Sequence, residues 1–244
     1  MIMKLEICTN SYQSAKNAQD AGAHRIELCS ELAVGGITPN YGLLKQVSEN
    51  LSIETFVLIR PRSGNFTYSN TEFEIMKSNI KLCKDLGFSG VVSGVLNADN
   101  TIDIKRTKVL VELAKPLQFT FHRAFDWTPN PEEALHELID LGVQRILTSG
   151  QSVSAEKGIE ILKSLKIKAE NKIVILPGGG VSVENAILFR DEGFTEIHAS
   201  LTKLEKLNES PIISMNSKKH FKETHLAVSN SEKIKELLCN LKNE

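Results

Sequence analysis

Carboxylate, thiol and imidazole side chains occur two positions apart in three short apolar segments of the chain. The pairs are Glu6 and Cys8, Glu27 and Cys29, and His198 and Ser200. Side chains two positions apart in a strand project to the same side of it, so each pair would face one common space. Carboxylates and imidazoles can exchange protons with a substrate, whereas thiols can act as nucleophiles, bind soft metals or fill a core.

The cysteines by themselves leave these roles open. The chain has four, at positions 8, 29, 83 and 239, without a C-x-x-C pair. Separate thiols of this kind are a weak signal for a metal site. Because they are too few for a disulfide scaffold in a chain of 244 residues, we expect reduced thiols in a reducing compartment. Cys8 and Cys29 could be metal ligands or small buried hydrophobic residues.

A second set of residues is suited to binding an anion. The arginines of this set can each donate two parallel hydrogen bonds to a carboxylate or phosphate. The glycine run 178–180 comes shortly before an expected helix start, where backbone N–H groups can bind a phosphate. The predicted ligand-binding residues are Arg60, Arg62, Arg123, Asp126, Gly178, Gly179 and Ser200. A tight loop that merely needs small residues explains the glycines equally well.

An enzyme built on these residues would use acid and base chemistry, and no organic cofactor is indicated. The acid and base candidates are Glu6, Glu27, His122 and His198. No lysine ends an expected strand, which argues against Schiff-base chemistry, and the G-x-G-x-x-G, Walker and H-E-x-x-H motifs are absent. The structural alternative is a network of buried ion pairs and, for His122, a core histidine with satisfied hydrogen bonds.

The elements that would position these residues alternate between apolar strands and amphipathic helices. Eight strands are expected, at Leu5 to Thr9, Arg25 to Ser30, Ile53 to Ile59, Gly90 to Leu96, Gln118 to His122, Arg145 to Ser149, Lys172 to Pro177 and Glu196 to Ser200. Because the intervening segments are long enough for crossover helices, the strands should be parallel.

An internal repeat favours a closed barrel. The pattern Asp-x-Gly occurs at 20–22, 85–87, 140–142 and 191–193, and a β-branched residue follows six positions after each aspartate. The glycine suits the left-handed end of a helix, and the run after it suits a buried strand. The four copies mark alternate strands and predict an α/β fold, a single (β/α)8 barrel of the TIM type over residues 1–244.

The last part of the chain departs from this alternation of strands and helices. Residues 202–230 are polar and rich in Lys, Ser and Asn, and we expect a loop or tail there. An extra C-terminal helix is predicted over 231–241, where Ile234, Leu237, Leu238 and Leu241 share one face.

In a barrel, the C-terminal ends of the strands form the functional mouth. The repeat aligns Glu27 with His198, and the first two strands are neighbours about 4.8 Å apart. The residues expected to converge in one part of the mouth are Glu6, Cys8, Glu27, Cys29 and His198.

The composition excludes several kinds of partner. With 29 basic and 30 acidic residues, the chain has no global positive field for nucleic acid or an anionic membrane. Its longest apolar runs are far shorter than the roughly 20 residues of a membrane helix, and no signal segment is recognised. We therefore expect a cytoplasmic protein that binds neither nucleic acid nor a membrane.

Seven segments, in order along the chain, resemble the CutC copper homeostasis family. They are Leu5 to Cys8, Arg25 to Cys29, Gly35 to Pro39, Ile59 to Arg62, Phe119 to Asp126, Arg145 to Gly150 and Pro177 to Gly180. The resemblance runs from about Leu5 to Ser200. It implies a (β/α)8 barrel, a cytoplasmic location, a homo-oligomer (dimer or tetramer) and a connection to copper handling.

The family's proposed Cu(I) ligands correspond to Cys8 and Cys29, and both thiols are present. Cu(I) is a soft ion that prefers thiolates, so the resemblance predicts a copper homeostasis protein that binds Cu(I) at the barrel mouth. The alternative is a barrel enzyme that acts on a small anionic or phosphorylated metabolite. The chain departs from the family pattern at Ser63, where a glycine is frequent, and after Ser200.

Overall fold

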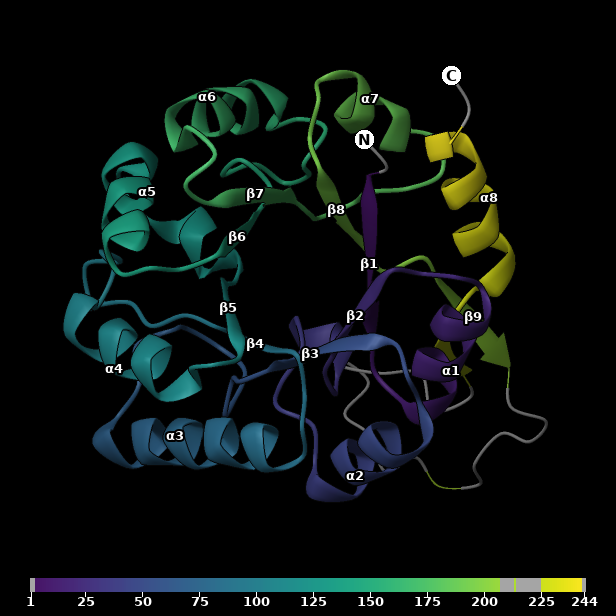
Figure 1. Ribbon diagram of the computed structural model, residues 1–244, viewed down its shortest axis with the longest axis horizontal. Helices are drawn as coiled ribbons and strands as arrows, with labels where there is room; N and C mark the ends of the chain where they lie inside the picture. Colours follow the sequence, from purple (N-terminus) through teal and green to yellow (C-terminus); the bar gives the residue numbers. More distant parts are fainter. Residues whose placement is uncertain (1–2, 207–212, 214–224, 243–244) are drawn as a thin grey trace.

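Eight parallel strands form a ring in the computed structural model, which describes residues 3–206, 213 and 225–242. The strands are β1 (Lys4–Thr9), β2 (Arg25–Leu28), β3 (Glu54–Leu58), β4 (Gly90–Ser93), β5 (Gln118–Phe121), β6 (Arg145–Thr148), β7 (Val174–Pro177) and β8 (Glu196–Ala199). Consecutive strands pair from β1 to β7, β8 pairs with β1, and a parallel bridge between Gly178 and His198 joins β7 to β8. The strands surround the centre of the molecule in Figure 1, which confirms the predicted TIM-type barrel.

The helices form a layer outside this ring (Figure 1). They are α1 (Tyr12–Asp20), α2 (Tyr41–Asn50), α3 (Asn70–Asp85), α4 (Ile104–Ala114), α5 (Pro131–Asp140), α6 (Ile159–Ala169), α7 (Ala186–Asp191) and α8 (Ser231–Lys242). Two short 3-10 helices, η1 (Leu32–Val34) and η2 (Arg123–Trp127), lie in the loops after β2 and β5. Since these loops leave the C-terminal ends of strands, η1 and η2 belong to the mouth of the barrel.

Polar side chains fix where several helices begin. The Ser69 hydroxyl accepts a hydrogen bond from the Glu72 N–H, and the Glu72 carboxylate accepts one from the Ser69 N–H, which forms a capping box before α3. Asn130 caps α5 directly before Pro131, which has no N–H that needs a partner. These caps satisfy N–H groups that the first helical turn leaves unbonded, so each helix begins at a defined residue.

The Asp-x-Gly repeat marks turns from helix to strand, as its pattern predicts. The glycines of all four copies have a positive φ, 89° at Gly22, 74° at Gly87, 74° at Gly142 and 71° at Gly193. Residues with a Cβ avoid this left-handed conformation, so glycine ends the helix and directs the chain into the next strand.

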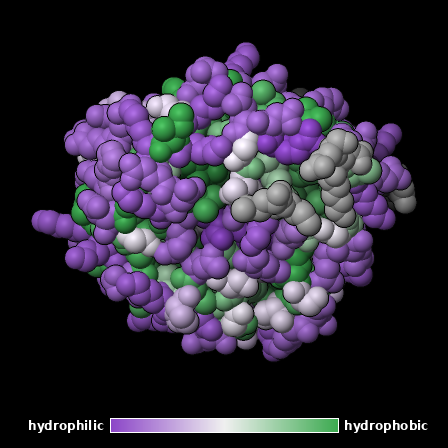
Figure 2. Space-filling view, turned by 45° about the horizontal axis from the view of Figure 1, so that its top comes forward, coloured by the Kyte–Doolittle hydropathy of each residue, from purple (hydrophilic) through white to green (hydrophobic). Residues whose placement is uncertain are grey.

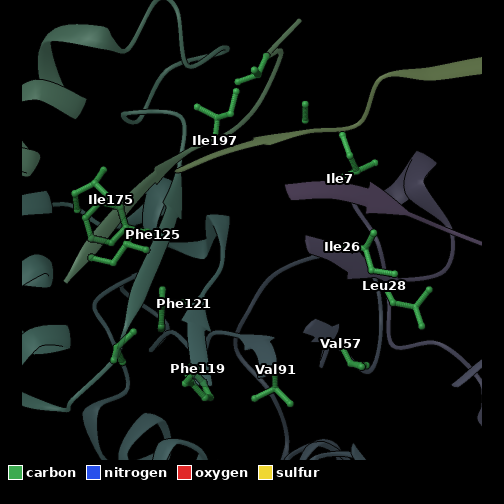
Figure 3. Close-up of a cluster of buried hydrophobic side chains, with 14 of the residues drawn as sticks. Ile7, Ile26, Leu28, Val57, Val91, Phe119, Phe121, Phe125, Ile175 and Ile197 are labelled. Atoms are coloured by element: carbon green, nitrogen blue, oxygen red, sulfur yellow. The ribbon is translucent and has the colours of Figure 1, made fainter. Parts of the chain in front are cut away.

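Strand residues divide alternately between two cores. Outward-facing side chains such as Ile7, Ile26 and Val91 pack in the large core between strands and helices (Figure 3). A smaller apolar cluster lies inside the barrel and consists of Cys8, Cys29, Phe56, Leu58 and Val92. Phe56 occupies the space beside Gly90, where a Cβ atom would lie only 2.7 Å from the aromatic ring. The interior is therefore filled by side chains and leaves no pore.

A buried ion network lies in the barrel interior around Phe56. Arg25 on β2 bonds Glu6 on β1 and, at 2.5 Å, Glu196 on β8. Arg145 on β6 donates to the same Glu196 oxygen at 2.9 Å. Both guanidinium groups lie over the Phe56 ring, 4.7 and 5.0 Å from its centroid. Because an unpaired buried charge is costly, these contacts fix strands from opposite parts of the ring relative to one another.

The segment 202–230, expected as a polar loop or tail, has strands at both of its ends. Strand β9 (Thr202–Lys206) pairs antiparallel with β10 (His225–Ser229), and residues 207–212 and 214–224 lie outside the described part. All five β9 residues are exposed, so this pairing rests on backbone hydrogen bonds and gives no apolar pattern in the sequence. The predicted C-terminal helix is confirmed as α8, whose apolar face is buried.

The molecular face drawn in Figure 2 is hydrophilic over most of its area, with hydrophobic residues in small separate groups. Within residues 3–206 and 225–242, none of the helices has the length and apolar composition that crossing a membrane requires.

Candidate functional site

A cavity of about 370 Å³ opens at the C-terminal ends of the strands. The predicted site residues that line it are Cys8, Glu27, Arg60, His122, Arg123, Asp126, Gly179, His198 and Ser200. Glu6 and Cys29 lie behind this lining, in contact with His198 and Cys8, respectively. Arg62 and Gly178 are not part of the lining. The structure thus brings most of the predicted residues to one cavity.

The two thiols face each other inside the barrel. The Cys8 and Cys29 sulfur atoms lie 3.8 Å apart, and Cys29 is completely buried whereas Cys8 is in the cavity wall. The thiol–thiol contact with Cys29, together with burial, raises the pKa of Cys8 well above its usual value. Without a metal, Cys8 is therefore a protonated thiol at neutral pH.

A carboxylate–imidazole–carboxylate cluster lies next to the thiols. The Nδ1 atom of His198 lies 2.7 Å from Oε1 of Glu6 and 3.7 Å from Oε2 of Glu27. All three residues are buried, and their potential metal-ligating atoms lie within 4.8 Å of one another. The register that pairs Glu6 with His198 and Cys8 with Glu27 produces this arrangement, since strands β8, β1 and β2 are neighbours.

The two carboxylates have opposite pKa shifts. Burial raises the pKa of Glu27 to about 7, because the attraction of His198 and Arg25 does not offset desolvation. Burial acts in the same direction on Glu6, but Arg25 and His198 outweigh it and lower the pKa of Glu6 to about 2. For His198, hydrogen bonds to Cys8 and Glu6 and the nearby carboxylates outweigh burial and raise its pKa. The cluster can hold a shared proton near neutral pH.

The predicted anion-binding arginines Arg60 and Arg62 have different surroundings. Arg60 is buried in the cavity wall. Its Nη atoms donate hydrogen bonds of 2.8 Å to the backbone carbonyl oxygens of Val34, Gly36 and Gly64. The guanidinium also lies 5.1 Å from the Phe66 ring centroid, and its Nε has no hydrogen-bond partner among the described residues. Arg62 points away from the cavity and bonds Glu72 at 2.5 Å, so it holds the loop after β3 in place.

His122 is a buried neutral imidazole. Its Nδ1 accepts a hydrogen bond from the Ala124 N–H at 3.2 Å, so the ring proton belongs on Nε2. Burial, with a contribution from the Arg60 charge, lowers the pKa of His122 to about 3. Within the described chain, Nε2 has no hydrogen-bond partner. His122 therefore keeps one unused donor, which is buried beneath the cavity surface.

We expect His122 to make the folded protein sensitive to acid. Its pKa is about 3 in the folded state and about 6.5 in the unfolded chain, so between these values only the unfolded state binds the proton. The stability contributed by the neutral ring is complete above pH 6.5 and decreases as the pH falls, by about 2 kcal/mol at pH 5.

Urea unfolding at pH 7 and pH 5 measures this effect in the wild type and in His122→Asn, whose amide oxygen can still accept the Ala124 hydrogen bond. Other acid-sensitive groups are common to both proteins, so the variant should lose about 2 kcal/mol less between the two pH values. Equal losses would show that the ring is not held neutral.

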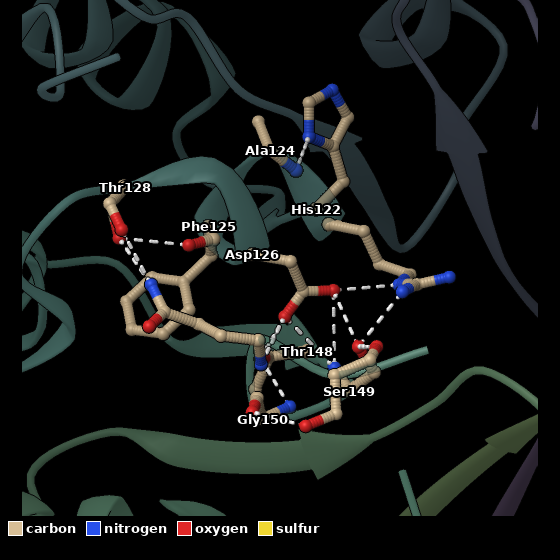
Figure 4. A network of polar contacts seen from close by, with 11 residues as sticks. His122, Ala124, Phe125, Asp126, Thr128, Thr148, Ser149 and Gly150 are labelled. Atoms are coloured by element: carbon tan, nitrogen blue, oxygen red, sulfur yellow. Dashed lines mark hydrogen bonds and ion pairs between the residues drawn. The ribbon is translucent and has the colours of Figure 1, made fainter. Parts of the chain in front are cut away.

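A network around Asp126 fixes the third arginine (Figure 4). The Asp126 carboxylate accepts hydrogen bonds from Thr148 and from the backbone N–H groups of Ser149 and Gln151. Arg123 donates from Nε to Asp126 at 2.7 Å and from Nη2 to the Ser149 hydroxyl at 2.8 Å. Asp126 is saturated with donors and therefore positions Arg123 instead of offering an acceptor to a ligand.

Gly179 allows Arg123 to lie against the loop after β7. A Cβ at Gly179 would lie 3.2 Å from Cζ and Nη1 of Arg123, and its φ of 102° also favours glycine. Arg123 is 44% exposed at the side chain, which leaves the outer edge of the guanidinium accessible from the cavity. The glycine loop thus serves the arginine as well as the backbone turn.

Sequence reasoning did not identify Phe66, which lines the cavity, as a site residue. Phe66 comes from the loop after β3, and its ring lies 4.8 Å from that of His122 and 4.9 Å from that of Trp127. No strand or helix pattern predicts the direction of a side chain in such a loop. Ser149 ends an expected strand, a position that predicts a place at the barrel mouth, and its hydroxyl accepts a hydrogen bond from Arg123.

Comparison with known proteins gives a consistent result. Residues 3–203 match the model of the CutC family. A CutC family protein from Proteus mirabilis is 48% identical over 200 residues, which cover 82% of this chain and 80% of the relative. The copper homeostasis protein cutC homolog of Homo sapiens is 45% identical over 80% of this chain and 72% of its own length. The solved structure of CutC from Streptococcus agalactiae superposes with a TM-score of 0.77 at 35% identity, covering 81% of this chain and 98% of that one.

Proposed function

The chain belongs to the CutC family, and from this membership and the geometry of the barrel mouth we propose that it serves copper homeostasis by binding Cu(I) through Cys8 and Cys29. The copper homeostasis role comes from the names of relatives such as the mouse and human homologues. The ligand assignment comes from the two thiols.

The observation that carries the proposal is the 3.8 Å separation of the two sulfur atoms. A metal–thiolate bond is about 2.3 Å long, so two sulfurs can bind one ion when they are less than about 4.6 Å apart. Cys8 and Cys29 meet this condition without any movement of strands β1 and β2. Because Cu(I) is soft and accepts few ligands, two thiolates are a suitable donor set.

The surroundings of the thiols also suit a monovalent soft cation. Cys29 is fully buried, so the ion would have to reach it from the cavity past Cys8. Binding requires both thiols to lose their protons. His198, which hydrogen-bonds to Cys8, favours the thiolate, whereas the Cys29 contact and burial favour the thiol. Copper would therefore replace the thiol–thiol contact with two metal–sulfur bonds.

Titration of the reduced protein with Cu(I) in the presence of a competing chelator tests the proposal. We expect saturation at about one copper per chain, because one pair of facing thiols occurs among the described residues. Cys239→Ser is the matched control, since Cys239 is exposed on α8 and far from the pair in sequence. A stoichiometry that drops in this control, or the absence of competition with the chelator, would contradict the assignment.

A further inference from the structure

The cavity beside the thiols has chemistry that copper binding does not use. Three of the residues that line it are at least 94% buried and each have one polar atom without a hydrogen-bond partner in the described chain. These atoms are Nε of Arg60, Nε2 of His122 and Oε2 of Glu27. Buried polar groups are nearly always paired, so several groups without hydrogen-bond partners directly beneath the surface of one cavity point to a ligand that reaches them after a small shift of the wall side chains.

Hydrogen-bond donors come from the β3 and β5 part of the wall. Arg60 and the neutral His122 each keep one N–H unused, and both are held in place by backbone hydrogen bonds. Arg123 follows His122 in the chain, and its Nη1 makes no hydrogen bond to the residues that the structure describes. Two guanidinium groups and one neutral N–H donor in one wall suit the oxygen atoms of an anion.

An acceptor comes from β2, the strand next to β3 in the ring. Glu27 lies on β2 between β1 and β3, and its Oε2, which has no hydrogen-bond partner in the described chain, is 3.7 Å from Nδ1 of His198. A carboxylate oxygen at this place suits a hydroxyl or ammonium group of a ligand. Leu58 and Leu147 lie in the wall as well and are apolar. The cavity thus offers donors and an acceptor in a space of about 370 Å³, which suits a small metabolite.

We propose that this cavity binds a small organic oxyanion that also carries a hydroxyl or ammonium group. The anionic oxygens lie against Arg60, His122 and Arg123, and the second group donates a hydrogen bond to Glu27. The oxyanion can be a carboxylate or a phosphate, since both accept from the same donors. This ligand site shares the cavity with Cys8 but uses other side chains, so it can exist whether or not Cys8 and Cys29 bind copper.

The test measures ligand binding to the metal-free protein by calorimetry, with a copper chelator present. The probes are acetate and inorganic phosphate, which have only the anionic group, and glycerate and glycerol 3-phosphate, which add hydroxyl groups. We expect glycerate or glycerol 3-phosphate to bind with a Kd below about 1 mM and at least about tenfold more tightly than its simple counterpart. If glycerate binds more tightly than glycerol 3-phosphate, the site is a carboxylate site, and the reverse order indicates a phosphate site.

Variants then connect the binding to the wall residues. Arg123→Met and His122→Phe should each weaken binding of the hydroxylated probe about tenfold or more, because each removes one donor. Glu27→Leu should abolish the preference for the hydroxylated probe. Lys16→Met is the control, since Lys16 lies exposed on α1 outside the cavity lining, and it should leave binding unchanged.

The proposal is wrong if neither hydroxylated probe binds more tightly than acetate or phosphate, or if Arg123→Met binds them as the wild type does. A melting curve identifies any variant that fails to fold. Arg123→Met remains informative if a substitution of the more deeply buried His122 or Glu27 prevents folding, because Arg123 is partly exposed.

Discussion

Replacing Cys8 and Cys29 together with serine is expected to weaken Cu(I) binding by more than about 100-fold. Removing a residue that only hydrogen-bonds to a metal ligand already reduces metal affinity by about 10- to 100-fold. Removing both direct ligands should therefore reduce the affinity by more than this. A serine hydroxyl is slightly smaller than a thiol and is a hard oxygen donor, which Cu(I) disfavours. Competition with a chelator at fixed pH measures the change.

The single variants make this measurement more specific. Because both sulfurs lie within reach of one ion, Cys8→Ser and Cys29→Ser should each lose most of the affinity, whereas Cys83→Ser and Cys239→Ser should retain it. Cys83 is buried on α3 in the outer core, so it also controls for the effect of placing a hydroxyl in an apolar site. A double variant at positions 8 and 29 that folds and competes for copper like the wild type would refute the ligand assignment.

The second large effect concerns stability. Arg25→Met is expected to lower the free energy of unfolding by about 3–5 kcal/mol, because it leaves buried carboxylates without their main counter-charge. Arg25 bonds both Glu6 and Glu196. Among the ion pairs of the described residues, its loss leaves Glu196 with Arg145 and Glu6 with His198. Methionine preserves much of the side-chain volume, so the loss measures the charge and its hydrogen bonds.

Urea unfolding at pH 7 measures this loss. Lys16→Met is the control, because Lys16 forms an exposed ion pair with Asp20 that should contribute little to stability. If the free energy of unfolding of Arg25→Met is within about 1 kcal/mol of the wild-type value, the buried carboxylates do not depend on Arg25. The network around Phe56 then does not fix the barrel interior.

The fold was predictable because its signals are local and repeated. The Asp-x-Gly turns and the alternation of strand residues specify where strands begin and which side chains point inward. The same alternation places Glu6, Glu27 and His198 together, since register across neighbouring parallel strands follows once the barrel is assumed. Part of the candidate site could therefore be located from the sequence.

The directions of loop side chains were not predictable in this way. Arg60 and Arg62 are two positions apart, yet one lines the cavity and the other bonds Glu72, because the loop after β3 turns between them. Phe66 reaches His122 only through that turn. The β9–β10 pairing was missed for a different reason. All five β9 residues are exposed, so the sequence of β9 has no alternation of apolar and polar residues that would predict a strand.

The contact between Glu6 and His198 has a consequence for the order of folding. These residues are 192 positions apart in the chain, whereas Cys8 and Cys29 are separated by only 21. The thiols can approach each other as soon as β1 and β2 pair, but the imidazole arrives only when β8 joins β1 and closes the ring. Contacts over such long separations form slowly. A nascent chain would therefore present its two thiols long before the barrel surrounds them, and closure of the ring is the step that completes the site.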